Sequence, residues 1–501
     1  MNRLKPTLRP LVLALTLAEF AACSGADGTS GASGGSTSGG GLQSGGIASG
    51  GHNSSAGGLM SGGVSAGGTN SGGVATGASS SGGTSAGGAA GGGAAGGGTS
   101  GGASPNGGSS AGGSPASGGS GTGGNSSGST LAEMYPCDGS TEGYDAIVTG
   151  SGSNWTVNGS GNHASLLLAM RAALGSGGTS ENDKRTVLLV DDGTLPSNEQ
   201  LRVSSNTVLN ACGTITVVDP TGGSDRSPIY ARGASHIDLP HLTLRGNAQY
   251  GCFFREAEHV HIGIADIRLE GGLGIRIDNN PGGNDWGNSS NNAARVAGFQ
   301  FDDVYVENVS MGVEFYGVED ITIGKVVARD TSEAGLMLNN SVDAEIGLVD
   351  GERVSPNAGY AVFRMANDNG KDWDTETHPM NIHVGKVIAR DSGGSNGQGI
   401  FCLTDSGGVT IDEVDLEDTA SNSIWLEWCT NVQIGNASTP SRIVNSGNVM
   451  ISYGTDTRMS NDLVLENIAI SGTNINFNQE CPPNIDWINV TRNGAAVSEC
   501  D

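Results

Sequence analysis

The sequence has few basic residues for its length. Its 501 residues include 24 Lys and Arg but 51 Asp and Glu, which gives a formal net charge of −27. A protein that binds nucleic acid needs a clustered basic surface, so this balance argues against nucleic acid as a partner. It argues equally against an anionic polymer such as polygalacturonate. An acidic surface fits an exported protein that must stay soluble.

Helical periodicity and metal-binding motifs are also scarce. The repeating units described below lack the helical pattern of ankyrin and tetratricopeptide repeats and the regular Leu spacing of leucine-rich repeats. There is no CxxC pair, and no cluster of Cys and His predicts a zinc site. We therefore expect no metal or other cofactor, although a structural calcium ion is left open. No stretch after the first 23 residues is long and apolar enough to span a bilayer.

The first 23 residues resemble an export signal. Three basic residues precede the apolar run 11–17, and two alanines come directly before Cys23. Small residues before a cysteine are typical of bacterial lipoprotein signals, so we predict lipidation at Cys23; an ordinary cleaved secretory signal is the alternative. The protein is then exported, as an outer-membrane lipoprotein, on the cell surface or in the extracellular medium. Its contact with a membrane is expected only through the lipid.

Residues 24–130 are almost wholly Gly, Ser, Ala and Thr, and no charged residue occurs between Gly28 and Ala132. Such a composition cannot bury enough apolar surface to offset the loss of chain entropy on folding. We predict a disordered linker here, and a single folded domain over residues 131–501.

One phrase recurs through this domain. The segment Ile321–Asp330 returns as Ile382–Asp391 and Val409–Asp418, at a spacing of roughly 22 to 25 residues where no insertion intervenes. Each unit contains short alternating runs separated by Gly, Asn, Asp and Ser, which predict three short strands. Strands this short bury their apolar faces only when units stack around a shared core. We therefore predict an all-β fold, a right-handed parallel β-helix with three sheets.

One helix is predicted, over Ala164–Leu174, with Asn162 as candidate N-cap and Gly175 beyond its end. It precedes the first coil and is expected to cover the open end of the core.

Cysteines are expected to form disulfides near both ends of the domain, because an exported chain is oxidised. Two others lie at inward-facing strand positions and are predicted to be buried thiols, while Cys429 has no assigned role. The predicted pairs are Cys137 with Cys212 and Cys481 with Cys500, and the predicted thiols are Cys252 and Cys402.

One strand in each coil begins after Gly or another small residue, and every second side chain of that strand points outward. The outward set combines carboxylates, aromatic rings and hydrogen-bonding groups, which is what a carbohydrate cleft requires. Two polar insertions, 279–297 and 367–380, flank this face; they are expected to be functional, with plain surface elaboration as the alternative. The expected substrate-binding residues are Arg276, Glu314, Tyr316, Asn339, Trp286, Arg364 and Trp373.

Asp278 is the strongest single catalytic candidate, because it lies at an outward-facing position at the end of a strand, directly before the first insertion. Hydrolysis of a glycosidic bond needs a second carboxyl group. Asp302 and Asp303 follow about one coil later, but the repeat register aligns them with Gly324 and Lys325, at a turn between two other strands. On that register, the partner comes from Glu314, Asp320, Asp368 or Asp372.

Several phrases are more specific than a generic β-helix repeat. They are Asn206–Ile215, Pro228–Ala234, Gly271–Asn279, Tyr316–Val318, Gly359–Asn367 and Gly399–Cys402.

In these phrases, from about Thr141 to the C-terminus, the chain resembles the glycoside hydrolase family 87 α-1,3-glucanases, also called mutanases or mycodextranases. The resemblance implies a β-helix that hydrolyses α-glucan with inversion. It implies Asp302 as the general acid, with Asp278 and Asp303 positioning and activating the water.

Two alternatives stay open. A polysaccharide lyase would need Ca²⁺-binding carboxylates and a basic residue near a uronate. Arg255, Arg276 and Arg364 favour it, whereas the overall acidity counts against it. A non-catalytic surface protein that binds carbohydrate is the other alternative. In each case we expect a monomer.

Overall fold

The computed structural model describes residues 129–218, 227–279, 295–356, 359–394, 397–453, 458, 460–477, 481–482 and 484–498. They belong to one compact unit, residues 115–501. The predictions for the signal, Cys23 and residues 24–128 of the linker lie outside the described residues, as do Trp286 and Cys500.

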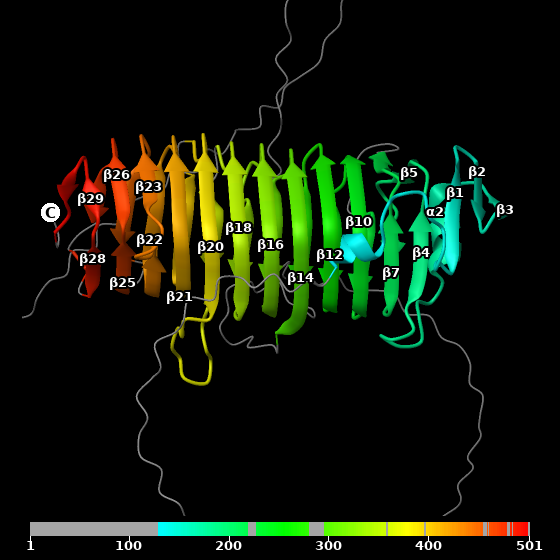
Figure 1. Ribbon diagram of the computed structural model, residues 1–501, viewed down its shortest axis with the longest axis horizontal. Coiled ribbons are helices and arrows are strands. Elements are labelled where there is room, and N and C mark those ends of the chain that lie inside the picture. The colour runs from blue at the N-terminus through cyan, green and yellow to red at the C-terminus, as the bar shows by residue number, and fades with distance from the viewer. Residues whose placement is uncertain are drawn as a thin grey trace, which may run out of the picture. The chain divides into compact units, whose positions relative to one another are not determined.

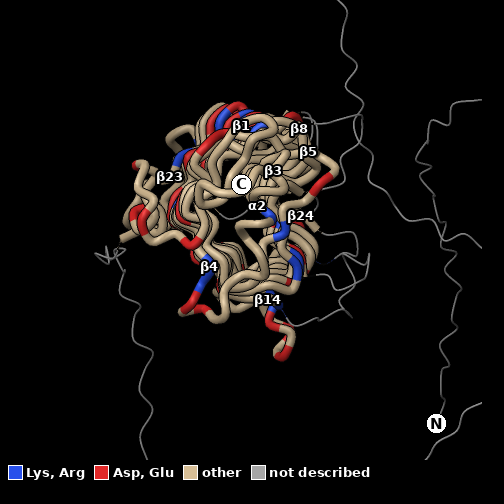
Figure 2. The backbone as a smooth tube through the Cα atoms, turned by 90° about the vertical axis from the view of Figure 1, so that its right-hand side faces the viewer, with Lys and Arg blue, Asp and Glu red and all other residues tan. Residues whose placement is uncertain are grey.

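The described residues form the predicted parallel β-helix, with about eleven coils (Figure 1). A central coil shows the plan. Strand β16 (Val318–Arg329) bends at Gly324 and supplies two of the three sheet segments, and β17 (Leu336–Asn339) supplies the third. Two of the three predicted short strands are therefore one bent strand. Viewed along the stack, the coils superimpose (Figure 2).

Parallel pairing holds each strand in register with its equivalents in the coils before and after it. Phe299 pairs with Ile321, and Ile321 with Ala344, so the equivalent residues of successive repeats form ladders. The long strands of the first and second sheets are β10 (Ser235–Gly246), β12 (Glu258–Leu269), β14 (Val296–Glu307), β16, β18 (Ala344–Glu352) and β20 (Ile382–Arg390). The third sheet contains β11 (Tyr250–Arg255), β13 (Leu273–Asp278), β15 (Met311–Tyr316), β17 and β19 (Ala361–Ala366).

Both ends of the solenoid depart from this plan. The first two coils use separate short strands, and β21 and β22 each run through more than one sheet. The N-terminal strands are β1 (Ala146–Ser151), β2 (Asn154–Val157), β3 (Ser160–His163), β4 (Arg185–Leu189), β5 (Gly193–Pro196), β6 (Leu201–Arg202), β7 (Thr207–Ala211), β8 (Ile215–Val218) and β9 (Ile229–Arg232). The C-terminal strands are β21 (Gln398–Glu417), β22 (Asn422–Ile434), β23 (Ser441–Val444), β24 (Asn448–Ser452), β25 (Asn461–Glu466), β26 (Ile468–Ser471), β27 (Ile475–Phe477), β28 (Ile485–Ile488), β29 (Thr491–Arg492) and β30 (Ala495–Ala496). The stack thus continues past Ile470 through β27 and β28.

The core consists of inward Ile, Val, Leu and Phe side chains from all three sheets. Phe301 of β14 and Phe315 of β15 are fully buried, and their ring centroids lie 5.3 Å apart across the core. Adjacent strands of the third sheet approach each other closely at a column of glycines. A Cβ atom on Gly274 would lie 2.4 Å from the carbonyl oxygen of Gly312, which explains why glycine is the second residue of β11, β13 and β15.

The predicted helix is α2 (Leu166–Leu174), which packs on β1, β2 and β4 at the N-terminal end of the solenoid (Figure 1). Gly175 follows it as predicted, but Asn162 is not the N-cap. Asn162 lies in β3, and the side chain of Ser165 instead accepts a hydrogen bond from the backbone N–H of Leu168.

A short helix, α1 (Leu131–Met134), begins the described domain. Thr130 is its N-cap, and the helix packs against β10 and β12. Among the described residues, neither α1 nor α2 is long and apolar enough to cross a membrane.

The cysteine predictions are correct in part. Cys137 and Cys212 form a disulfide, and Cys252 is a buried free thiol. The prediction of a buried thiol at Cys402 is wrong, because Cys402 is bonded to Cys429 of the next coil. The backbone of Trp428 has a φ of 57°, and the chain turns there so that Cys429 is fully buried. Cys481 is also disulfide-bonded.

Candidate active site

A row of outward side chains runs along the third sheet. Aromatic residues lie toward both ends of the row, and charged residues occupy its middle. In-register pairing aligns Arg202, Tyr230, Phe253, Arg276, Glu314, Met337, Arg364, Phe401, Trp425 and Met450. A second row beside it contains Arg232, Arg255, Asp278, Tyr316, Asn339 and Ala366.

Arg276 joins two carboxyl groups at the centre of these rows. Its Nη1 donates to Glu314 Oε2 at 2.7 Å, and its Nε lies 3.4 Å from Asp278 Oδ2. Arg255 donates to the same oxygen of Asp278 at 2.9 Å. Asp278 is fully buried, and Glu314 is 4% exposed. The central charges are therefore removed from bulk water and paired with one another.

Two asparagines continue this network on the C-terminal side. Asn339 Nδ2 lies 3.5 Å from Glu314 Oε1, and Asn339 Oδ1 accepts a hydrogen bond from Asn367 Nδ2 at 3.1 Å. The structure thus brings together Arg276, Asp278, Glu314 and Asn339, as predicted from the strand alternation. Tyr316 lies next to Asp278 in the second row.

Burial dominates the electrostatics of the site. It raises the pKa of Glu314; Arg276 opposes this effect, and the negative charges of Asp278 and Glu333 add to it. Burial, together with Glu314 and Asp278, also raises the pKa of Tyr316. Glu314 therefore keeps its proton to higher pH than an exposed glutamate does.

Arg364 lies two strands from Glu314 in the same row. Its guanidinium is 4.5 Å from the ring centroid of Tyr360, and its Nη1 lies 2.8 Å from the sulfur of Met337. Burial lowers the pKa of Arg364. Its buried Nε has no hydrogen-bond partner within the described part of the chain.

The insertion 367–380 lies close to Asn340, the residue after Asn339. Lys371 is buried and forms ion pairs with Asp405 at 2.9 Å and Glu376 at 3.0 Å. Trp373 packs under Lys371, and its indole N–H lies 3.4 Å from Asn340 Oδ1. The insertion is thus anchored by a buried lysine, and Trp373 contacts Asn340, which follows Asn339 of the second row.

Asp302 and Asp303 have other neighbours. They lie in β14, where Asp303 pairs with Lys325 in register, as the repeat alignment predicts. Phe301 beside them faces Phe315 across the core, so this bend lies on the opposite side of the coil from the third sheet. The structure therefore does not bring Asp302 and Asp303 together with Asp278.

The other three carboxylates considered from sequence are also dispersed. Asp368 is half-buried near Lys371 and contributes to the raised pKa of Tyr316, which places it near the second row. Asp372 hydrogen-bonds within its own turn to Asp374 and Thr375. Asp320 lines a different cavity, with Asp343, Glu345 and His383 among its other lining residues.

Asp302 anchors the first helix. It accepts hydrogen bonds from His261 and Gln300, each at 3.0 Å, and from the backbone N–H of Leu131 in α1. Burial acts to raise the pKa of Asp302, but these hydrogen bonds outweigh it and lower the pKa.

We therefore expect Asp302→Ala to release α1 without affecting the third sheet. The loss of hydrogen bonds to a charged group should lower the local stability of residues 129–136 by about 1–3 kcal/mol. Hydrogen exchange of the α1 amides measures it. Asp303→Ala is the matched control, because it removes only a half-exposed pair with Lys325, which should cost less than about 1 kcal/mol. Equal protection of α1 in both variants would contradict this role.

Two residues near the site were not chosen from sequence. Tyr360 lies under Arg364, and burial raises the pKa of both Tyr360 and Glu333. Each lies in the turn just before a third-sheet strand. The strand pattern does predict these turns, but the alternation of side chains along a strand does not predict where the side chain of a turn residue points.

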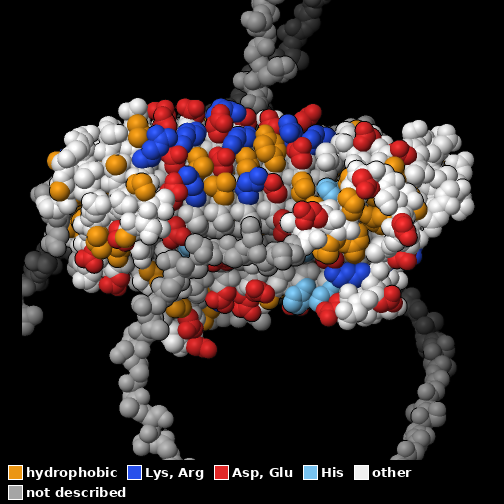
Figure 3. Space-filling view, viewed as in Figure 1, with side chains coloured by type: hydrophobic (Ala, Val, Ile, Leu, Met, Phe, Trp, Pro, Cys, Tyr) orange, Lys and Arg blue, Asp and Glu red, His pale blue; other side chains and the backbone are white. Residues whose placement is uncertain are grey.

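Other charged features of the described residues are accounted for by structure. Rows of basic and acidic side chains cover the long strands (Figure 3). On the second sheet they alternate in register: Arg329 lies between Glu307 and Glu352, and it also forms a diagonal ion pair with Asp350 at 2.9 Å. The group Cys137, Cys212 and His241 has metal-ligand spacing, but its two sulfurs are bonded to each other.

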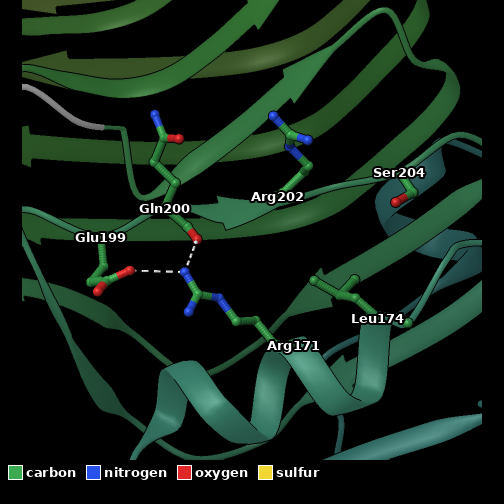
Figure 4. Close-up of a pocket in the computed structure, with 7 residues that line it drawn as sticks. Arg171, Leu174, Glu199, Gln200, Arg202 and Ser204 are labelled. Atoms are coloured by element: carbon green, nitrogen blue, oxygen red, sulfur yellow. Dashed lines mark hydrogen bonds and ion pairs between the residues drawn. The ribbon is translucent and has the colours of Figure 1, made fainter. Parts of the chain in front are cut away.

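A pocket of about 350 Å³ lies at the N-terminal end of the first row, beside α2 (Figure 4). Arg171 points across it to Glu199 at 2.9 Å and to the carbonyl oxygen of Gln200 at 3.0 Å. Arg202, the first member of the row, also lines it. The pocket thus marks the end of the row, away from the carboxyl pair.

No protein-family model matches the sequence, and no curated protein matches it. Among solved structures, the chain is similar to the A-module of the Azotobacter vinelandii mannuronan C-5 epimerase AlgE4, with a TM-score of 0.35 and 13% sequence identity. The match covers 66% of this chain and 95% of the module. Since this similarity is weak, function must be argued from the residues of the site.

Proposed function

We propose that the protein is a polysaccharide-active enzyme, a glycoside hydrolase that cleaves α-1,3-glucan with inversion. The observation that carries the proposal is the pair Asp278 and Glu314. The two carboxyl groups lie on adjacent coils, and both contact Arg276.

One guanidinium joins the two carboxyl groups. Glu314 lies two residues before Tyr316, the strand partner of Asp278, and Arg276 contacts both carboxyl groups. The carboxyl groups of inverting enzymes lie about 6.5–9.5 Å apart, and those of retaining enzymes about 5–5.5 Å apart. The proposal of inversion rests on the family resemblance.

The two environments support different roles. Burial raises the pKa of Glu314, so it is the candidate general acid that donates to the leaving oxygen. Asp278 is the candidate base that activates water. Arg276 contacts both and positions them. In this proposal Glu314 takes the acid role that the family resemblance implies for Asp302.

The flanking aromatic residues support a polymeric sugar substrate. Tyr250 and Phe253 stack at 4.7 Å on the N-terminal side, and Phe401 and Trp425 stack at 4.6 Å on the C-terminal side. Apolar faces of sugar rings pack well against such surfaces. The α-1,3 linkage itself rests on the sequence resemblance. Export, a lipid anchor and a monomeric state remain part of the proposal.

The test is reducing-sugar release from insoluble α-1,3-glucan, with nigeran, dextran and polygalacturonate assayed in parallel. We expect release from α-1,3-glucan by the unmodified protein and none above background by Asp278→Asn. Retention on a polymer without release would instead favour a carbohydrate-binding protein. The anomeric form of the first product, followed by polarimetry, tests inversion.

The pH at which kcat/KM falls on the alkaline side of the optimum should depend on Glu333. Because Glu314 must be protonated to act as an acid, activity should fall as pH rises through its raised pKa. The negative charge of Glu333 contributes to that raised pKa. Glu333→Gln should therefore move the alkaline limb of kcat/KM to lower pH while keeping activity at the optimum. Glu376→Gln is the control, since Glu376 pairs with Lys371. An unmoved limb in Glu333→Gln would argue against Glu314 as the titrating acid.

A second candidate is a polyuronate lyase, which Arg364 favours. Its guanidinium is buried in the row and lies at salt-bridge distance from no carboxylate of the described residues, and a uronate carboxylate would fit that charge. Ultraviolet absorbance of an unsaturated uronate product detects this reaction. Its appearance on polyuronates, with no release from α-glucan, would replace the hydrolase proposal.

A further inference from the structure

Another cavity lies at the C-terminal end of the first row of the third sheet. It has a volume of about 550 Å³ and is lined by Gly359, Gln398, Ser421, Asn422, Trp425, Asn448 and Met450. None of these lining residues carries a charge, in contrast to the centre of the row. Its lining offers amides, a hydroxyl and an aromatic ring.

Three side-chain amides line this cavity at matching positions of successive coils. Gln398 pairs in register with Asn422, and Asn422 with Asn448. Asn422 is only 6% exposed, and its side-chain amide makes no hydrogen bond to the residues that the structure describes. Its amide lines the cavity and keeps some contact with solvent, so it can donate to and accept from a ligand there.

Trp425 is held rigidly at the wall of the cavity. Its indole N–H donates to Ser452 Oγ at 2.8 Å, and Phe401 stacks on one ring face with an interplanar angle of 16°. A fixed aromatic ring beside amide groups matches a neutral sugar, which has apolar ring faces and hydroxyl edges.

Distance from the carboxyl pair sets what this cavity can bind. Glu314 and Trp425 are four strand steps apart in the row, through Met337, Arg364 and Phe401. At the spacing of neighbouring strands this is roughly 19 Å. Only a chain of several sugar units reaches from one to the other.

We propose that this cavity is a distal subsite that binds a neutral sugar unit of the polysaccharide chain whose bond lies at Asp278 and Glu314. The inference rests on the proposed function for its substrate. It makes Trp425 and Asn422 determinants of chain-length preference, without a part in bond cleavage.

The test measures binding apart from catalysis. Affinities of α-1,3-linked gluco-oligosaccharides of increasing length are determined by calorimetry in the Asp278→Asn protein, with and without Trp425→Ala. We expect Trp425→Ala to weaken long oligosaccharides about tenfold and to leave short ones unchanged. Asn422→Ala should act in the same direction. Trp428→Ala is the matched control, because Trp428 lies on the same strand and packs on Arg458.

The outcomes separate the two proposals. If the unmodified protein cleaves α-1,3-glucan but Trp425→Ala changes neither long-chain affinity nor KM for the polymer, the subsite is refuted alone. An equal loss for short and long oligosaccharides would also refute it. If no polymer is cleaved, but one neutral glucan still binds in a length-dependent manner that requires Trp425, the subsite stands and the hydrolase proposal fails.

Discussion

Replacing Glu314 with Gln is expected to lower kcat on α-1,3-glucan by about two to four orders of magnitude, the usual contribution of a positioned general acid. Glutamine fills the same space and can still accept a hydrogen bond from Asn339, so folding should be largely retained. It cannot deliver a proton to the leaving oxygen. Initial rates of reducing-sugar release measure the effect, and circular dichroism confirms that the variant is folded.

A matched experiment decides between the two acid assignments. Asp302→Asn should retain most of the activity, because Asp302 contacts His261, Gln300 and α1 on the other side of the coil. Asp303→Asn should do the same. Loss of activity in Asp302→Asn with full activity in Glu314→Gln would restore the triad that the family resemblance implies and would reject Glu314.

Phe315→Ala is expected to lower the free energy of unfolding of the central coils by about 3–5 kcal/mol. Phe315 is fully buried, and its ring lies against Phe299 and Phe301. Removing it leaves a cavity that β-strands held in register on both sides cannot close. Because Glu314 and Tyr316 flank this residue on β15, kcat should fall as well.

Chemical denaturation measures the loss in the free energy of unfolding. Hydrogen exchange of the backbone amides of β13, β15 and β17 shows whether the loss falls on the central coils. Phe477→Ala is the control. Phe477 is only partly buried on the last third-sheet strand, so its removal should cost less and leave kcat unchanged. A loss as large in Phe477→Ala would mean that the central stack is not the best-packed part of the core.

Much of the fold could be predicted from sequence because each coil repeats the same local pattern. The phrase Ile321–Asp330 and its copies give the ladder register directly, and alternation identifies the outward positions. Departures from the repeat were less predictable. The N-cap at Ser165 depends on where β3 ends, and the Cys402–Cys429 disulfide depends on a turn at Trp428.

The sequence identified which strand residues belong to the candidate site, but it was less informative about the role of each residue. Asp278, Arg276 and Glu314 follow from alternation, but the contacts of Arg276 with both carboxyl groups do not, because side-chain reach across strands is not encoded in spacing. The resemblance and the repeat register gave conflicting positions for Asp302. The observed pairing of Asp303 with Lys325 supports the register.

The in-register stack has a consequence for how such a protein can change. Each coil between Glu314 and Trp425 adds one strand spacing, roughly 4.8 Å, and leaves the ladders on either side intact. If the proposed function holds, deleting or duplicating one complete coil would therefore alter the length of sugar chain recognised in fixed increments, while the proposed acid and base keep their contacts. The reach of this scaffold along a polymer would then vary with coil number, independently of the proposed catalytic pair.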